Sequence, residues 1–308
     1  MTGGRSGVVV GVDGGGTSTE VIVADLAGQV LATATTGGSN HESIGIDAVA
    51  EVLAAAVGEA LASADASRAD VVAAVFGLAG VDWPSDVERV GEAVGRLGLG
   101  GTQLVVNDSQ IALRAGCRQP WGIVSCVGTG SVTAGRGRRG EWFRTMGVGF
   151  GEPSGAGTIV RGALDAVAAT HHGAAEPTAL TERFLSALGH PDVLAMFEAL
   201  TRRPAAGLRW LAPVVTELAD GDDPVARRIV TEVATRHSEL VVGVARRLEL
   251  VDDSFDVVTA GAVHRAGGVF SETFAVGVER ALPGATIVAL TTSSAVGAVR
   301  LALDTLER

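Results

Sequence analysis

Short apolar runs, separated by turns rich in glycine, open the sequence. Val8–Val12 is the first run, and Thr19–Asp25 and Gln29–Thr35 follow it closely. Apolar runs bounded by turn residues predict strands. After a loop over 37–45, apolar residues recur every three or four positions from 46 to 64, which predicts a helix. The continuous apolar run Val71–Phe76 predicts a further, buried strand.

The same order of strands begins again about 115 residues later. Gly122–Val127 leads into the turn Gly128–Ser131, then Val132–Gly135 returns and Glu141–Thr145 forms a third strand. Between the two sets we predict a helix over 85–97, a strand over 104–106 and a helix from residue 109. A repeat of this kind fixes the architecture. We therefore expect two similar α/β domains, each offering one glycine-rich hairpin to a shared cleft.

Helical spacing dominates the second half of the chain. We predict helices over 156–170, 177–188, 191–200, 208–219, 225–250, 269–281 and 294–306, and strands over 256–260 and 286–290. No linker of low complexity separates the two halves, so we place a hinge between Asp108 and Trp121.

Composition and charge narrow the class of protein. A length of 308 residues favours two domains. A net charge of −11 argues against nucleic acid or an anionic membrane as partner. The sequence has no apolar run of about 18 residues and its first seven residues resemble no signal peptide, so we expect a cytoplasmic protein. Two cysteines, Cys117 and Cys126, are too few for a disulfide framework or a structural zinc site.

The first glycine-rich turn carries the residue types of a phosphate and metal site. Gly14, Gly15 and Gly16 let a ligand approach the backbone and let several N–H groups point at it. Thr17, Ser18 and Thr19 add hydroxyl donors. Asp13 adds a carboxylate suited to Mg²⁺, through waters. The alternative is an ordinary hairpin turn. The motif lacks the Gly-Lys-Ser/Thr of a Walker loop.

The second turn and an aspartate between the turns extend this pattern. Gly128, Thr129, Gly130 and Ser131 can donate to phosphate from backbone and side chain, or form a plain turn. Asp108 follows a predicted strand, where α/β proteins place catalytic groups, and a carboxylate there could deprotonate a hydroxyl. The alternative for Asp108 is a helix N-cap.

Taken in order, these motifs resemble the sugar kinase/Hsp70/actin superfamily. More closely, the chain is similar to the N-acetylglucosamine kinases and the related BadF/BadG/BcrA/BcrD ATPases over essentially its full length. The resemblance implies two actin-like (ribonuclease H-like) ATPase domains with a cleft between them, the second enlarged by helices. We place them at 1–117 and 118–293, with a final helix over about 294–308 packing back on the first.

The resemblance also implies the ligands and their residues. ATP and Mg²⁺ would be the cofactors, Asp108 the catalytic base and Asp13 the metal-binding residue. The loop with Gly261 and Ala262 looks like the adenosine loop. As partners we expect a small-molecule sugar and a second copy of the chain, and neither nucleic acid nor a membrane.

Two segments resemble the sugar-binding loops of the family. One contains Asn40 and His41. The other runs from Gly147 to Ala156 and departs from the family pattern, since Glu152 stands where the family has the aspartate that binds sugar. Glutamate keeps the charge but reaches about one methylene further, which puts the identity of the sugar in doubt. Surface polar residues are the alternative for both loops.

Three functions are compatible with the sequence. The first is an ATP-dependent kinase that phosphorylates a hexosamine hydroxyl, most simply the 6-hydroxyl of N-acetylglucosamine. The second is a BadF-type ATPase that activates a partner through an iron–sulfur cluster bridged by cysteines, which Cys117 and Cys126 do not match in arrangement. The third is a nucleotide-binding regulator without catalysis.

Overall fold

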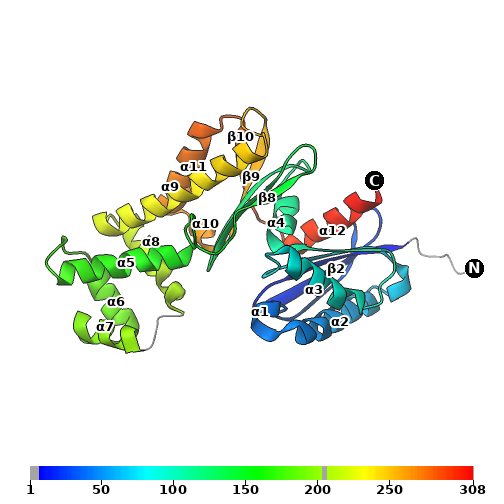
Figure 1. The fold of residues 1–308 in the computed structure, drawn as a ribbon, viewed down its shortest axis with the longest axis horizontal. Coiled ribbons are helices and arrows are strands. Elements are labelled where there is room, and N and C mark those ends of the chain that lie inside the picture. Colours follow the sequence, from blue (N-terminus) through cyan, green and yellow to red (C-terminus); the bar gives the residue numbers. More distant parts are fainter. Residues whose placement is uncertain (1–6, 203–206, 308) are drawn as a thin grey trace, which may run out of the picture. The chain divides into compact units, whose positions relative to one another are not determined.

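The computed structural model describes residues 7–202 and 207–307, so the expectation about a signal peptide in the first residues lies almost wholly outside it. The chain divides into two compact units (Figure 1). Unit 1 comprises Met1–Pro120 with Leu290–Arg308, and unit 2 comprises Trp121–Ala289. Unit 1 is therefore assembled from two segments that are far apart in the sequence.

Unit 1 is an α/β unit with a five-stranded sheet. Its elements are β1 (Val8–Gly14), β2 (Ser18–Ala24), β3 (Val30–Gly37), α1 (His41–Ile44), α2 (Ile46–Ser63), the 3₁₀ turn η1 (Arg68–Asp70), β4 (Val71–Leu78), α3 (Pro84–Gly95), β5 (Thr102–Asn107), α4 (Asp108–Gly116) and α12 (Ser294–Leu306).

Unit 2 has a second five-stranded sheet and most of the helices. Its elements are β6 (Gly122–Val127), β7 (Ser131–Arg136), β8 (Trp142–Arg144), α5 (Ala156–His171), α6 (Leu180–Leu188), α7 (Val193–Arg202), the 3₁₀ turn η2 (Leu208–Leu211), α8 (Ala212–Asp220), α9 (Pro224–Arg247), β9 (Phe255–Ala260), α10 (Ala262–Ala266), α11 (Gly268–Ala281) and β10 (Ala285–Ala289).

The two sheets have the same topology, which confirms the predicted repeat. Their orders are β3-β2-β1-β4-β5 and β10-β9-β6-β7-β8. In each sheet the first three strands pair antiparallel, and the first strand pairs parallel with a fourth strand that pairs parallel with a fifth. The carboxyl ends of β1, β4 and β5 therefore meet at one edge of the sheet in unit 1, and those of β6, β9 and β10 meet at one edge in unit 2.

Helix α12 completes the core of unit 1, and Figure 1 shows this red helix among the blue and cyan elements. A methyl group at Gly297 would overlap the carbonyl oxygen of Ile111 in α4, so only glycine permits this approach of the two helices. Arg114 Nε and Nη2 donate to the Asp304 carboxylate at 2.9 and 3.1 Å. Ala295 and Val299 are buried in the same cluster as strand residues of unit 1.

Some segments differ from the elements that we predicted, among them the short helices η1 and α10, which the sequence did not indicate. The loop over 37–45 contains the helical turn α1, because Asn40 accepts a hydrogen bond from Glu42 N at 2.9 Å and caps it. The predicted helix over 208–219 is wrong at its start: residues 208–211 form η2 and α8 begins at Ala212. Pro213 has no N–H to donate to the carbonyl four residues earlier, so the α-helical hydrogen bonds cannot run through this point.

Candidate active site

The first glycine-rich turn joins β1 to β2 and is closed by backbone hydrogen bonds. Gly15 N donates to Ser18 O at 2.9 Å, and Ser39 N donates to Gly15 O at the same distance. Nothing lies within 4 Å of where a Cβ on Gly16 would stand, so the tip of the turn is open to a ligand. Thr17 and Ser18 are exposed there.

Thr19 has a structural role instead. Its side chain is buried, and Oγ1 lies 2.8 Å from both Gly37 O and Ser39 Oγ. Its hydroxyl is one of the predicted phosphate donors, but these contacts use it instead to attach the loop that precedes Asn40 to the turn.

Three carboxylates lie near one another in unit 1. Burial, followed by the charges of Asp108 and Glu20, raises the pKa of Asp13 from 3.8 to about 6. Asp13 lies at the carboxyl end of β1, and Asp108 directly follows β5. The sheet order thus brings together the two aspartates that the sequence pattern singled out.

Asn107, rather than Asp108, caps helix α4. The Asn107 side chain accepts a hydrogen bond from Ser109 N at 3.1 Å, while its Nδ2 donates to Asp82 Oδ1 at 3.0 Å. The N-cap was the alternative that we considered for Asp108, and its place is taken by the preceding residue. The Asp108 carboxylate is therefore not required for this capping bond.

The segment with Asn40 and His41 packs against the loop after β4. A Cβ on Gly80 would lie 2.7 Å from Asn40 Oδ1. His41 Nε2 lies 3.4 Å from Asp86 Oδ1, and both side chains are largely buried. Within the described part of the chain, the buried Nδ1 of His41 has no hydrogen-bond partner. Asn40 and His41 are thus fixed in place, unlike freely solvated surface residues.

The second glycine-rich turn, in unit 2, is tied to the start of helix α5. Gly128 N donates to Gly130 O at 2.9 Å, and Ala156 N donates to Gly128 O at 2.9 Å. Ser131 Oγ donates to Pro153 O at 2.5 Å, so this hydroxyl proton is already engaged. Nothing lies within 4 Å of where a Cβ on Gly130 would stand, as at the tip of the first turn.

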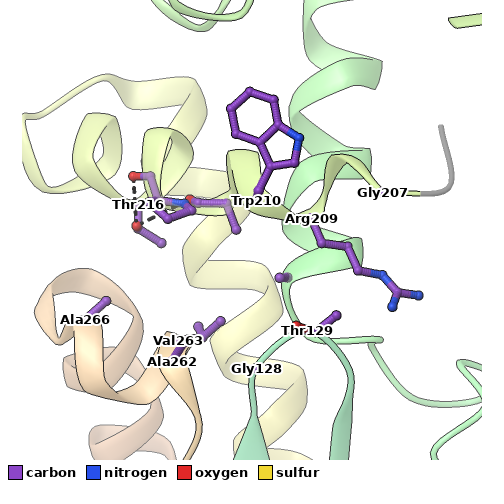
Figure 2. A pocket seen from close by; sticks show the side chains of 12 residues that line it. Gly128, Thr129, Gly207, Arg209, Trp210, Thr216, Ala262, Val263 and Ala266 are labelled. Carbon is purple, nitrogen blue, oxygen red and sulfur yellow. Dashed lines mark hydrogen bonds between the residues drawn. The ribbon is translucent and has the colours of Figure 1, made fainter. Parts of the chain in front are cut away.

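A cavity of about 630 Å³ opens beside this turn, within the size range of small-molecule sites. Figure 2 shows it bounded by the turn after β6, by η2 and α8, and by α10. Its described lining residues are Gly128, Thr129, Ala156, Gly207, Arg209, Trp210, Ala212, Pro213, Thr216, Ala262, Val263 and Ala266. Of the residues that we predicted for the nucleotide, Gly128, Thr129 and Ala262 line this cavity.

Gly261 shapes the cavity without lining it. Its φ of 96° is unfavourable for residues with a side chain, and a Cβ there would overlap Val127 O. The absence of a side chain lets the end of β9 lie against the end of β6. Ala156, which the resemblance assigns to the sugar, lines the same cavity as Gly128 and Thr129. The residues from η2 and α8 were missed, because the sequence showed only helical spacing there.

Glu152 lies inside the glycine-rich loop between β8 and α5. It is 5% exposed, its Oε1 accepts a hydrogen bond from Val148 N at 3.0 Å, and its buried Oε2 has no partner among the described residues. Gly147, Gly149 and Gly151 all have positive φ. The carboxylate therefore holds this loop closed on itself, and one of its oxygens is left to accept a hydrogen bond.

Neither a membrane span nor a metal cluster appears in the described residues. No described helix has both the length and the apolar character needed to cross a membrane. No group of three or more His, Cys, Asp or Glu residues in that part of the chain is arranged to hold a metal ion. Asp13 is thus a single carboxylate ligand candidate, rather than part of a full protein cage.

Comparison with known proteins identifies one family whose sequence model matches most of the chain. The sequence model of the BadF/BadG/BcrA/BcrD ATPase family matches residues 10–302. The chain is 29% identical to an N-acetylmuramic acid/N-acetylglucosamine kinase of Clostridium acetobutylicum, covering 96% of this chain and 97% of that protein. It is 26% identical to an N-acetyl-D-glucosamine kinase of Dictyostelium discoideum, covering 96% and 98%.

A solved structure shares the fold. The chain superposes on a candidate N-acetylglucosamine kinase from Chromobacterium violaceum with a TM-score of 0.72, at 24% identity, covering 97% of this chain and 99% of that one. The two repeated five-stranded sheets are thus those of an actin-like ATPase fold.

Proposed function

Because the chain belongs to the BadF/BadG/BcrA/BcrD ATPase family, we propose that it is an ATP-dependent kinase of an amino sugar. The acceptor that we favour is the 6-hydroxyl of N-acetylglucosamine. Two curated relatives that match nearly full length are named as kinases of N-acetylglucosamine, and one of them also as a kinase of N-acetylmuramic acid. N-acetylmuramic acid is therefore the second sugar to test.

The observation that carries this proposal is the pair of aspartates at the edge of the sheet in unit 1. Asp108 is close enough to Asp13 to contribute to the rise of its pKa. The side chain that caps α4 is that of Asn107, not that of Asp108. A kinase of this type needs one carboxylate to orient and deprotonate the attacking hydroxyl.

The reaction follows from this assignment. Asp108 accepts the proton of the sugar hydroxyl as its oxygen forms a bond to the γ-phosphorus of ATP. The bond between that phosphorus and the bridging oxygen of ADP breaks in line, so the products are a sugar phosphate and ADP. Chemistry of this kind depends mainly on positioning and on charge stabilisation.

The cavity of unit 2 fits the nucleotide. Its volume suits a small molecule, and the open glycine tip at Gly130 leaves room for phosphate oxygens near backbone N–H groups. Thr129 would donate to phosphate, while Ala262 and the backbone at Gly261 would lie against adenosine.

Asp13 fits a role in binding Mg²⁺. Burial, and after it the negative charges of Asp108 and Glu20, raises the pKa of Asp13, and a bound cation would offset both effects. Because no fuller cluster exists in the described residues, phosphate oxygens and waters would complete the coordination, as Mg²⁺ commonly prefers. When bound, the ion would neutralise charge on the transferring phosphoryl group.

We propose Asn40, His41, Gly147 and Glu152 as sugar-binding residues. Within the described residues, neither Asn40 Nδ2 nor His41 Nδ1 makes a hydrogen bond that would compete with a sugar hydroxyl, and Glu152 Oε2 can still accept one. Because Glu152 also closes its own loop, we expect it to act both as a ligand and as a support for that loop.

A panel of amino sugars tests the function directly. ADP release should require N-acetylglucosamine or N-acetylmuramic acid together with ATP and Mg²⁺, and Asp108→Asn should abolish most of it. ATP hydrolysis that no sugar stimulates would instead favour the partner-activating ATPase. Burial of Cys117 does not favour that alternative, because a cluster shared between subunits needs accessible thiolates.

Two further features belong to the same proposal. A cytoplasmic location would give the enzyme access to ATP, and cell fractionation tests it. A homodimer is the assembly that we propose, and light scattering of the purified protein tests it.

A further inference from the structure

The nucleotide cavity contains little positive charge. Among its described lining residues, Arg209 alone has a charged side chain. The sequence has 24 lysine-plus-arginine residues, and all of them are arginine. A protein without lysine cannot use an ammonium group to bind phosphate, so any cation that its side chains supply there must be a guanidinium or an imidazolium.

Arg209 lines the cavity beside the start of helix α5. A Cβ on Gly157, in the first turn of α5, would lie 3.6 Å from Arg209 Nε. The preceding residue of α5, Ala156, donates its N–H to Gly128 O at 2.9 Å. The first turn of α5 therefore lies next to both the Arg209 side chain and the glycine-rich turn after β6. Figure 2 shows the Arg209 side chain running from η2 toward the side of the cavity where Thr129 stands, whereas the Trp210 indole points the other way.

Nothing in the described part of the chain engages this guanidinium. Arg209 is exposed, and no hydrogen bond or ion pair joins it to a described residue. Neighbouring surface arginines in unit 2 are different: Arg161 pairs with Asp165 at 3.1 Å, and Arg183 pairs with Glu217 at 2.9 Å. Arg209 could therefore bind an anion without first breaking a contact to any residue in 7–202 or 207–307.

Resting on the proposed kinase function, we propose that Arg209 binds the terminal phosphates of the nucleotide. A guanidinium presents five N–H donors in a planar fork that matches two phosphate oxygens at once. Its charge also offsets the negative charge on the phosphoryl oxygens during transfer. Arg209, in η2, thereby adds a charged side chain that binds phosphate to the backbone N–H groups of the glycine-rich turn after β6.

Calorimetric titration with ADP and with adenosine separates this role from a structural one. Arg209→Ala should weaken ADP binding by on the order of tenfold to a hundredfold, as expected for a lost charged hydrogen bond. Adenosine has no phosphate, so its affinity should stay within about twofold of the parent. Arg209→Lys should retain part of the ADP affinity through its charge, because it loses only the fork. Arg161→Ala, a surface arginine outside the cavity, is the matched control and should bind both ligands like the parent.

Each outcome decides a different question. If Arg209→Ala binds ADP as tightly as the parent does, Arg209 is a surface residue and the inference is wrong. If ADP and adenosine weaken equally, Arg209 supports the cavity rather than the phosphates, which also overturns it. If the parent itself binds neither ligand, the proposed kinase function fails first.

Discussion

Asp13→Asn should stabilise the ligand-free protein at neutral pH while it impairs catalysis. The structure holds this carboxylate partly buried beside Asp108 and Glu20, and its pKa is raised to about 6. Asparagine has nearly the same shape but carries no charge, so it removes both the desolvation cost and the repulsion. The variant should still bind nucleotide in the cavity of unit 2, yet its Mg²⁺-dependent turnover should fall at least tenfold, because it lacks the carboxylate proposed to bind the ion.

The expected pH dependence has a definite sign. A carboxyl group whose pKa rises from 3.8 to about 6 on folding binds more protons in the native state than in the unfolded state between those values. The Asp13 contribution to stability therefore declines as pH rises from about 4 to 6, and it stays constant above. At about 1.4 kcal/mol per pH unit the full shift corresponds to about 3 kcal/mol, and partial exposure to solvent reduces this to roughly 1–3 kcal/mol.

Urea unfolding of parent and variant between pH 4 and 8, followed by circular dichroism, measures this difference. The variant should be more stable at pH 8, and the gap should close toward pH 4. Glu51→Gln, which removes an exposed carboxylate of α2 in unit 1, is the control and should change stability at pH 8 by less than Asp13→Asn does. A gap that is absent at pH 8, or that widens toward pH 4, would refute the electrostatic reasoning.

Three other substitutions test the remaining assignments. Asp108→Asn should lower kcat by roughly 10²–10⁴-fold with little change in ATP affinity, and a variant that turns over like the parent would exclude Asp108 as the base. Glu152→Gln should raise the sugar KM more than the ATP KM, because its free oxygen is proposed to contact sugar; a shift in the ATP KM alone would place it with the nucleotide. Burial first, and then the charge of Arg236, lowers the pKa of His237 to about 4, so stability should fall as pH drops from 6.5 to 4. His237→Leu should flatten that fall in urea titrations, and an unchanged slope would contradict it.

Local signals accounted for most of the fold. The three-strand motif repeats because apolar runs and glycine turns recur at nearly constant spacing, and strand pairing within each hairpin follows from adjacent sequence. Asp13 and Asp108 could be singled out for the same reason, since each follows an apolar strand. Their proximity depends only on the parallel order of β1, β4 and β5.

Contacts between distant segments account for what the sequence did not predict. Thr19 and Ser131 lie in the two glycine-rich motifs, where their hydroxyls were expected to donate to phosphate. In the structure, Thr19 donates to Gly37 O and Ser131 donates to Pro153 O instead. Arg209 carries no motif at all, and its place in the cavity depends on how η2 packs beside α5. Tertiary packing of this kind leaves no periodic signal in the sequence.

The split construction of unit 1 has a consequence during synthesis. Val9, Ile22 and Val75 share a buried cluster with α12, which the ribosome makes only after all of unit 2. At roughly 5–20 residues per second, about 8–34 s separate the synthesis of the two segments of unit 1. For that time the nascent chain exposes an apolar sheet face to solvent. It should therefore be sensitive to protease on stalled ribosomes and should be bound by chaperones. Unit 2 is contiguous in sequence, so it can fold before unit 1 is complete and should resist the same protease. Unit 2 is therefore expected to reach its native structure before unit 1 does.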